Sequence, residues 1–139
     1  DTLSLHDALP IWEDIEMPKA TSNVSEVTTF DLKSCEGGFI KARRLTYGEK
    51  LQRRAMVSGM KFQTEKGKKD FQGEMNLVSE QATMFDFERC IVEHNLEDED
   101  GRLLNLSSIS DVRKLDPRIG EEIDEHLSSL NNFEEDEGN

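Results

Sequence analysis

The chain has 139 residues, of which 30 are acidic and 17 are basic, and its formal net charge is -13. Only 35% of the residues are hydrophobic, which limits the chain to one small domain with a modest core. No apolar run approaches the roughly 20 residues of a membrane-spanning helix, and the negative charge opposes general binding to nucleic acid. The two cysteines, Cys35 and Cys90, exclude a disulfide scaffold and are expected to be reduced thiols of a cytoplasmic protein.

The first 28 residues show no pattern typical of a folded domain. Residues 2–11, TLSLHDALPI, match one reading frame of a common sequencing adapter, so we expect residues 1–11 to be an artefact without a role in folding. The protein's own start would then be Met17 or a position upstream of Trp12. A genuine amphipathic N-terminal arm is the alternative. Residues 12–28 mix Ser, Thr, Pro and charge without periodicity, which predicts an irregular lead-in.

The predicted domain, residues 29–133, begins with a β-hairpin. Residues 30–33 alternate apolar and polar side chains, Gly37 and Gly38 supply a turn, and residues 39–43 resume the extended pattern. An isolated hairpin is marginally stable in water. We therefore expect it to pack on the helices that follow or to pair with another chain.

A first helix is expected from Thr46, because Thr46 and Glu49 have the spacing of a capping box. Four residues at helical spacing are predicted to face the core: Tyr47, Leu51, Ala55 and Ser58. Three basic residues are predicted to lie outside: Lys50, Arg53 and Arg54. Gly59 and the segment TEKGKK, residues 64–69, predict a break in the helix and then a loop.

Apolar periodicity returns over residues 74–94, which predicts a central helix. Its expected core stripe consists of Leu77, Val78, Gln81, Ala82, Phe85, Glu88, Ile91 and Val92. Asn95 and the acidic run before Gly101 then predict a turn.

The last helix has the strongest pattern in the chain. After a helical turn expected at residues 108–114, Asp116 has the position of an N-cap and Pro117 that of the first helical residue. The predicted core face consists of Ile119, Ile123, Leu127 and Leu130. Residues 134–139 are expected to form a disordered acidic tail. The predicted fold is therefore mainly α with an N-terminal β-hairpin, a small helical domain of the α+β class.

Charge is segregated along the chain. Residues 41–69 hold 10 of the 17 basic side chains and two acids, whereas residues 86–139 hold 17 acids and five bases. The interpretation we favour is that the basic segment docks on the acidic half, within a chain or between subunits. A basic patch for RNA or DNA and a solvated face without a partner are the alternatives.

No arrangement of residues indicates catalysis, so we expect no enzyme. Cys90 and His94 have the spacing of half a zinc site and His126 could add a third ligand, but no clear fourth ligand exists and no metal is expected. The acidic run before Gly101 lacks both essential carboxylates of an EF-hand loop. No cofactor is expected either, because Gly37 belongs to no phosphate-binding or dinucleotide motif.

Phe87 does not fit the core stripe of the central helix. It lies roughly 200° around the helix from Phe85, so the two rings cannot face the same core. With Cys90 and His94, Phe87 forms a second stripe at i, i+3 and i+7. Our hypothesis is that this stripe is open and binds an amphipathic segment of a partner. The alternative is a helix enclosed on two sides, which would place Phe87 in the core.

Three segments carry a resemblance to a known family: GGFIKARRLTYGEKLQRRAM at 37–56, FDFERCIVEHNLEDEDGRLL at 85–104 and LDPRIGEEI at 115–123. They resemble tail assembly chaperones of long-tailed, siphovirus-type bacteriophages over most of residues 30–133. In that family a small acidic protein, often also made as a longer frameshifted product, binds the tape measure protein and keeps it soluble while tail-tube subunits assemble around it.

The resemblance implies a chaperone of the host cytoplasm that is absent from the mature virion. Its expected partner is the tape measure protein, with the tail-tube protein and a second copy of the chain as further contacts. One alternative is a small oligomeric structural protein of the virion tail or neck, which would use the hairpin edge for subunit contacts. The other is a nucleic-acid-binding phage regulator that uses the basic residues 43–69.

Overall fold

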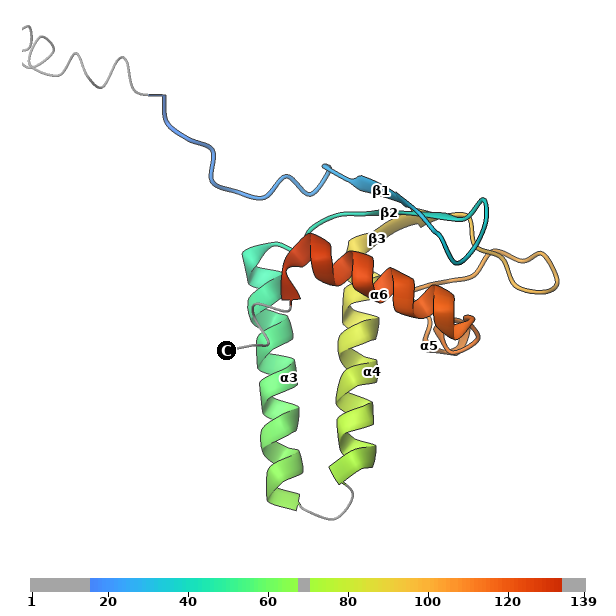
Figure 1. Cartoon of the computed structure of the whole chain (residues 1–139). Coiled ribbons are helices and arrows are strands. Elements are labelled where there is room, and N and C mark those ends of the chain that lie inside the picture. Colours follow the sequence, from blue (N-terminus) through green and yellow to red (C-terminus); the bar gives the residue numbers. More distant parts are fainter. Residues whose placement is uncertain (1–15, 68–70, 134–139) are drawn as a thin grey trace, which may run out of the picture.

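The computed structural model describes residues 16–67 and 71–133. The predicted adapter segment, residues 1–11, and the predicted acidic tail, residues 134–139, lie outside the described residues. Within the described ranges, four helices and a three-stranded antiparallel sheet form a small α+β domain (Figure 1). The predicted fold class is confirmed, with one strand more than the predicted hairpin. Residues 16–27 precede the first strand without forming a helix or a strand.

The sheet consists of the predicted hairpin and one later strand. β1 (Thr28–Asp31) pairs with β2 (Phe39–Ala42), and β3 (Ile91–His94) pairs with the other edge of β2. Gly37 in the hairpin turn has a φ of 81°, a left-handed conformation that glycine adopts without a steric penalty. Along β2, Ile40 and Ala42 are both fully buried, as the two-residue period of a strand requires.

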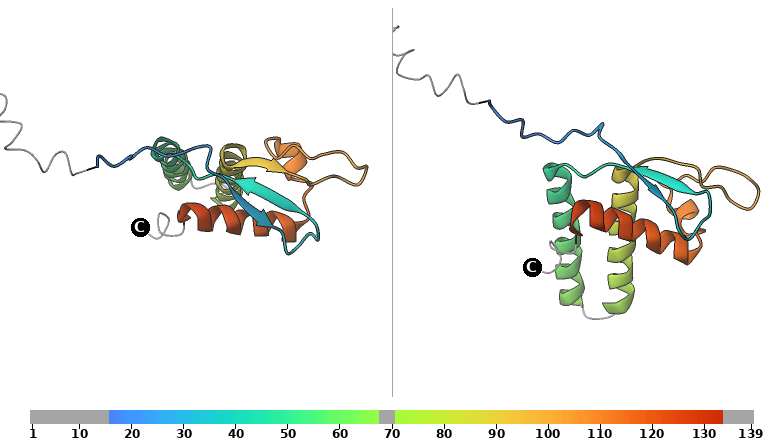
Figure 2. Two further views of the ribbon diagram at one scale, coloured as in Figure 1. Left: turned by 90° about the horizontal axis from the view of Figure 1, so that it is seen from above. Right: turned by 45° about the horizontal axis from the view of Figure 1, so that its top comes forward.

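The helices form two groups. α3 (Tyr47–Gly67) and α4 (Phe71–Cys90) are an adjacent pair that extends away from the sheet. α5 (Ile109–Val112) is a single short turn, and α6 (Pro117–Asn131) runs across the sheet end of the pair, under the hairpin (Figure 2). The side chain of Asp116 caps α6 by accepting from the backbone N–H of Arg118 at 2.9 Å, and Pro117 is the first helical residue, so the predicted start of this helix is confirmed.

The core lies where the sheet, the adjoining part of α4, α6 and the segment 95–106 meet. Ile123 and Leu127 of the predicted α6 stripe are 0% and 1% exposed, while Ile119 and Leu130 are half-buried at its edges. The buried apolar residues are Leu32, Ile40, Ala42, Leu45, Phe87, Cys90, Leu96, Leu104, Leu106, Ile123, Leu127 and Phe133.

The predicted central helix is wrong at its C-terminal end, because α4 stops at Cys90 and residues 91–94 form β3. Two β-branched residues, a type that favours strands, follow Cys90, and β3 pairs with β2 so that Ile91 lies opposite Ala42. The predicted core stripe is wrong in part, since Gln81, Glu88 and Val92 are exposed, whereas Phe85 and Ile91 are half-buried against the core. The buried residues of α4 among those whose side chains are described are Asp86, Phe87 and Cys90.

The predicted break in the first helix is wrong as well. α3 continues through Gly59 to Gly67, so residues 64–67 of the predicted loop are helical, and residues 68–69 lie outside the described ranges. One glycine within a helix costs only about 1 kcal/mol relative to alanine, which a helix of this length tolerates.

None of the helices among the described residues has the length and apolar character that a membrane-spanning segment needs.

Candidate partner-binding face

One side of α3 exposes apolar residues at helical spacing. Tyr47 is 67% exposed and Leu51, one turn later, is 47% exposed. Ala55 and Ser58 continue the same side and are also exposed. We call these four residues the α3 face. The sequence pattern predicted them to face the core, and that prediction is wrong.

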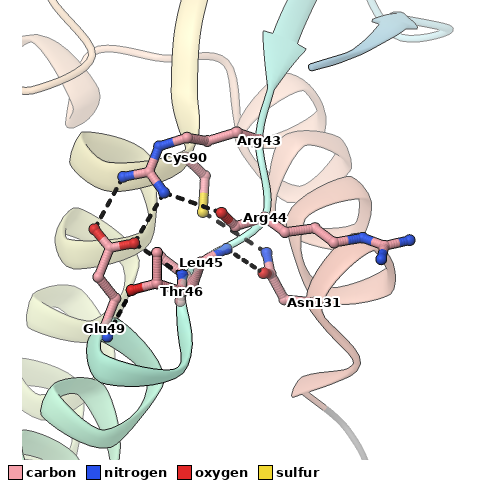
Figure 3. A network of polar contacts seen from close by, with 7 residues as sticks. All are labelled: Arg43, Arg44, Leu45, Thr46, Glu49, Cys90 and Asn131. Carbon is pink, nitrogen blue, oxygen red and sulfur yellow. Dashed lines mark hydrogen bonds and ion pairs between the residues drawn. The ribbon is translucent and has the colours of Figure 1, made fainter. Parts of the chain in front are cut away.

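Positive charge accompanies the α3 face. The guanidinium carbon of Arg54 lies 6.0 Å from the centroid of the Tyr47 ring, within the range of a cation–π contact. Arg44, just before the helix, is exposed, and its side chain points away from the polar network at the start of α3 (Figure 3). The α3 face thus combines an aromatic and an aliphatic side chain with the nearby guanidinium of Arg54.

A capping box fixes the start of α3, as predicted. The backbone N–H of Glu49 donates to Thr46 Oγ1 at 3.2 Å, and the backbone N–H of Thr46 donates to Glu49 Oε1 at 2.9 Å. The guanidinium of Arg43 donates two hydrogen bonds, of 2.8 and 2.9 Å, to the same carboxylate (Figure 3). These bonds from the Arg43 guanidinium lower the pKa of Glu49 to about 2.

Asn131, the last residue of α6, ties this start to the rest of the domain. Its Oδ1 accepts from the backbone N–H of Leu45 at 2.8 Å, and its Nδ2 donates to Leu127 O at 3.0 Å. The same Nδ2 lies 3.7 Å from Cys90 Sγ at the end of α4. Asn131 is only 3% exposed, so these bonds satisfy an amide that would otherwise be costly to bury. Figure 3 shows how they join three elements at one point.

A buried ion pair fixes which side of α3 faces inward. Arg53 Nε lies 2.8 Å from Asp86 Oδ1, and Arg53 Nη2 lies 3.1 Å from Asp86 Oδ2. The Arg53 guanidinium also stacks on Phe133, with 3.8 Å from Cζ to the ring centroid. Arg53 was predicted to lie outside the domain, but it is 9% exposed. Because Arg53 faces inward, the side of α3 that carries Tyr47 and Leu51 must face solvent.

The predicted binding residues Phe87, Cys90 and His94 do not share an open face. Phe87 and Cys90 are 1% and 0% exposed and belong to the core. His94 is half-buried in β3, where its Nδ1 accepts from the backbone N–H of Leu96 at 3.0 Å. The open-stripe hypothesis is therefore wrong. Its premise fails because the helix ends at Cys90, so His94 cannot continue a helical stripe, and Phe87 takes the enclosed position that was the alternative.

Burial also determines the chemistry of these residues. Desolvation raises the pKa of the Cys90 thiol to about 12 and holds the pKa of His94 below its usual value. Neither group is poised as a nucleophile or a cation at neutral pH. Among the described residues, no group of three or more His, Cys, Asp or Glu side chains is placed to hold a metal ion.

The basic segment docks in part on the acidic half of the same chain. Arg53 pairs with Asp86, and Lys41 Nζ lies 3.1 Å from Glu93 Oε2 across β2 and β3. These pairs match the interpretation that we favoured from the sequence, docking of the basic segment on the acidic half, in its version within one chain. Arg44 and Arg54 remain on the surface, and Arg54 lies beside the α3 face.

The chain matches no protein-family model, no curated protein and no solved structure. A proposal for the function must therefore rest on the α3 face and its charge.

Proposed function

We propose that the protein is a tail assembly chaperone of a long-tailed bacteriophage, which binds the tape measure protein and keeps it soluble in the host cytoplasm during tail-tube assembly. The observation that carries this proposal is the pair of exposed side chains, Tyr47 and Leu51, on one side of α3. Both residues fall within residues 37–56, the first of the three segments that resemble the chaperone family.

The physical properties of the α3 face fit a helical segment of such a partner. An amphipathic helix binds a partner by placing apolar side chains from successive turns against apolar residues of the partner. Tyr47 offers a large ring with a polar end, a residue type common among interface hot spots. The guanidinium of Arg54 beside the Tyr47 ring gives this face a positive charge, which favours a partner segment with acidic residues at the border of its apolar side.

The acidic body supplies the solubility that a chaperone needs. A long apolar polypeptide aggregates unless its exposed surface is covered or carries charge. The chain brings a net charge of -13, so each bound copy adds like charge to the complex and opposes association between complexes. Once the tail tube encloses the tape measure protein, the chaperone would be released, which places it outside the mature virion.

Co-expression with the tape measure protein of the same genome tests the proposal. The variant Tyr47→Glu/Leu51→Glu changes two exposed side chains and should fold, because neither contributes to the core. Each hot spot contributes about 2 kcal/mol to binding, which corresponds to roughly 30-fold in affinity. Loss of both should therefore lower the affinity by roughly 1,000-fold, and the tape measure protein should become insoluble. The matched control is Val92→Glu/Leu103→Glu, which makes the same double change at residues outside α3 that are 52% and 58% exposed.

Wild type and the control should keep the tape measure protein in the supernatant after centrifugation. Equal solubility with the double variant would contradict binding on the α3 face. Recovery of the protein from purified phage particles in stoichiometric amounts would contradict the chaperone and indicate a structural subunit.

A further inference from the structure

A cleft opens at the end of α6 opposite to the α3 face. Its volume is about 700 Å³, within the range of about 300 to 1,000 Å³ typical of ligand pockets. The cleft lies between the hairpin turn, the segment 95–104 and the first turn of α6, on the right side of Figure 1. Asp116 and Ile119 line it, whereas Asn131, twelve residues after Ile119, contacts the start of α3.

The inner wall of the cleft, which we call its floor, is apolar. Leu96 and Leu104 are 5% and 7% exposed, and Cys35, Leu115 and Ile119 are half-buried around them. Asn95, the amide side chain among the lining residues, already has hydrogen-bond partners. Its Oδ1 accepts from the backbone N–H of Phe39 and its Nδ2 donates to Gly37 O, each at 2.9 Å. The wall therefore offers a surface for an apolar group.

The walls are held in place by short-range contacts. A Cβ at Gly38 would lie 3.1 Å from both Cys35 Sγ and Leu96 Cδ2. The hairpin turn therefore packs so closely on Leu96 that a larger residue at position 38 would require a neighbour to move. Asp98 organises the other wall, since its Oδ1 accepts from the backbone N–H groups of Asp100 and Arg102 at 2.9 and 3.0 Å. The cleft is thus preorganised, which lowers the entropic cost of binding.

The rim of the cleft is strongly acidic. Six lining residues carry carboxylates, and Lys114 is the one basic residue among the lining residues. The acidic residues are Glu36, Glu97, Asp98, Glu99, Asp100 and Asp116. Backbone N–H groups of Arg102 and Asp100 hold the pKa of Asp98 below its usual value, which keeps this carboxylate charged. An apolar floor inside an acidic rim is complementary to an apolar side chain flanked by cations.

We infer that this cleft binds a basic segment of a protein partner, with an apolar side chain on the floor and flanking Lys or Arg side chains on the rim. The charge of the rim is opposite to that of the α3 face, so the two surfaces select segments of opposite charge. A small cation would leave the apolar floor in water, whereas a peptide covers the floor and pairs with the rim together. The inference does not depend on the proposed function.

Three synthetic nine-residue peptides test the inference by fluorescence anisotropy. The first has a central leucine flanked by lysines, the second replaces the lysines with glutamates, and the third replaces the leucine with serine. The lysine-leucine peptide should bind at least 10-fold more tightly than either of the others. Equal affinity for the lysine and glutamate peptides, or no binding of the lysine-leucine peptide, would overturn the inference.

Variants of the rim locate the binding. Glu36→Lys/Glu99→Lys reverses two exposed charges of the lining and should weaken binding of the lysine-leucine peptide by at least 10-fold. Glu88→Lys/Glu125→Lys reverses two charges at exposed positions of α4 and α6 that do not line the cleft, and should retain the wild-type affinity to within about threefold, since only long-range screened charge is altered. Equal losses in both variants would show that net charge, not the cleft, attracts the peptide.

Cys35 reports occupancy of the wild-type cleft directly. Its thiol lies in the wall, whereas the Cys90 thiol is fully buried with a pKa of about 12 and should not react. Saturating lysine-leucine peptide should slow the labelling of Cys35 by a thiol reagent at least fivefold. A peptide that binds without slowing this reaction would lie outside the cleft, which would overturn the inference. The variant Cys35→Ser confirms that the measured label is on Cys35.

Discussion

Glu49 has two structural roles at the start of α3. Its carboxylate closes the capping box with Thr46 and accepts both hydrogen bonds from Arg43. The side chains of Arg43 and Glu49 are only 16% and 17% exposed, so solvent screens the pair weakly. The orientation of Tyr47 and Leu51 therefore depends on an ionised Glu49.

The effect of Glu49 should depend on pH in a defined direction. Arg43 lowers its pKa from 4.5 to about 2, so its contribution to stability is fully present above about pH 4.5 and is lost as the pH falls toward 2. Glu49→Gln keeps an oxygen that can accept from the backbone N–H of Thr46 but removes the charge that binds Arg43. It should therefore lower the free energy of unfolding at pH 7 by about 1 to 3 kcal/mol, as expected for hydrogen bonds to a charged group. Urea denaturation at pH 7, 4.5 and 2.5 measures this difference.

The difference between wild type and Glu49→Gln should shrink between pH 4.5 and 2.5. The control is Glu125→Gln, an exposed carboxylate of α6, which should show a small difference at every pH. A deficit in Glu49→Gln that stays constant over this range would show that the ionised carboxylate is not what stabilises the start of α3.

The capping box could be predicted from the sequence because its partners are three positions apart. The burial of Arg53 could not, since Asp86 lies 33 positions away and a lone arginine is normally a surface residue. Once the sequence pattern placed Arg53 outside, the apolar residues on the opposite side of α3 had to be assigned to the core. The long-range ion pair reverses both assignments.

At the scale of elements, α3 shows how a helix passes through a residue that usually interrupts it. Gly59 is exposed in the middle of α3, and nothing lies within 4 Å of the position that a Cβ would take. Gly59→Ala should therefore stabilise the protein by about 0.5 to 1 kcal/mol, because alanine loses less backbone entropy in a helix. Thermal denaturation of the two proteins measures this gain.

Gly37→Ala provides the contrasting control. Its φ of 81° lies in the left-handed region, so a side chain there should destabilise the hairpin by about 1 to 2 kcal/mol. If Gly59→Ala lowered the melting temperature as Gly37→Ala should, α3 would not continue through Gly59 in solution.

The elements that could be predicted are those defined by neighbours in the chain. The start of α6 follows from Asp116 and Pro117, and the hairpin follows from its alternation and its glycines. β3 could not be predicted, because its residues follow a helical pattern without a break and its pairing with β2 joins positions about 50 residues apart. The same missed strand made the stripe of Phe87, Cys90 and His94 look helical.

At the scale of the whole molecule, two surfaces of opposite charge lie at the two ends of α6. The α3 face is apolar with Arg54 beside it, and the cleft near the hairpin turn is apolar with carboxylates around it. The sequence shows the separation of charge but not its placement, because the ion pairs of Arg53 and Lys41 remove part of the basic segment from the surface. The positions left exposed after folding determine which partners can bind.

The most direct test of the α3 face is a site-specific photo-crosslink in the complex with the tape measure protein. A benzoylphenylalanine in place of Tyr47 keeps a large ring at the 67% exposed position, and the same residue in place of Val92 samples β3. Irradiation of the co-expressed complex should crosslink position 47 to the tape measure protein and leave position 92 free. A crosslink from position 92 with none from position 47 would contradict the α3 face as the binding surface.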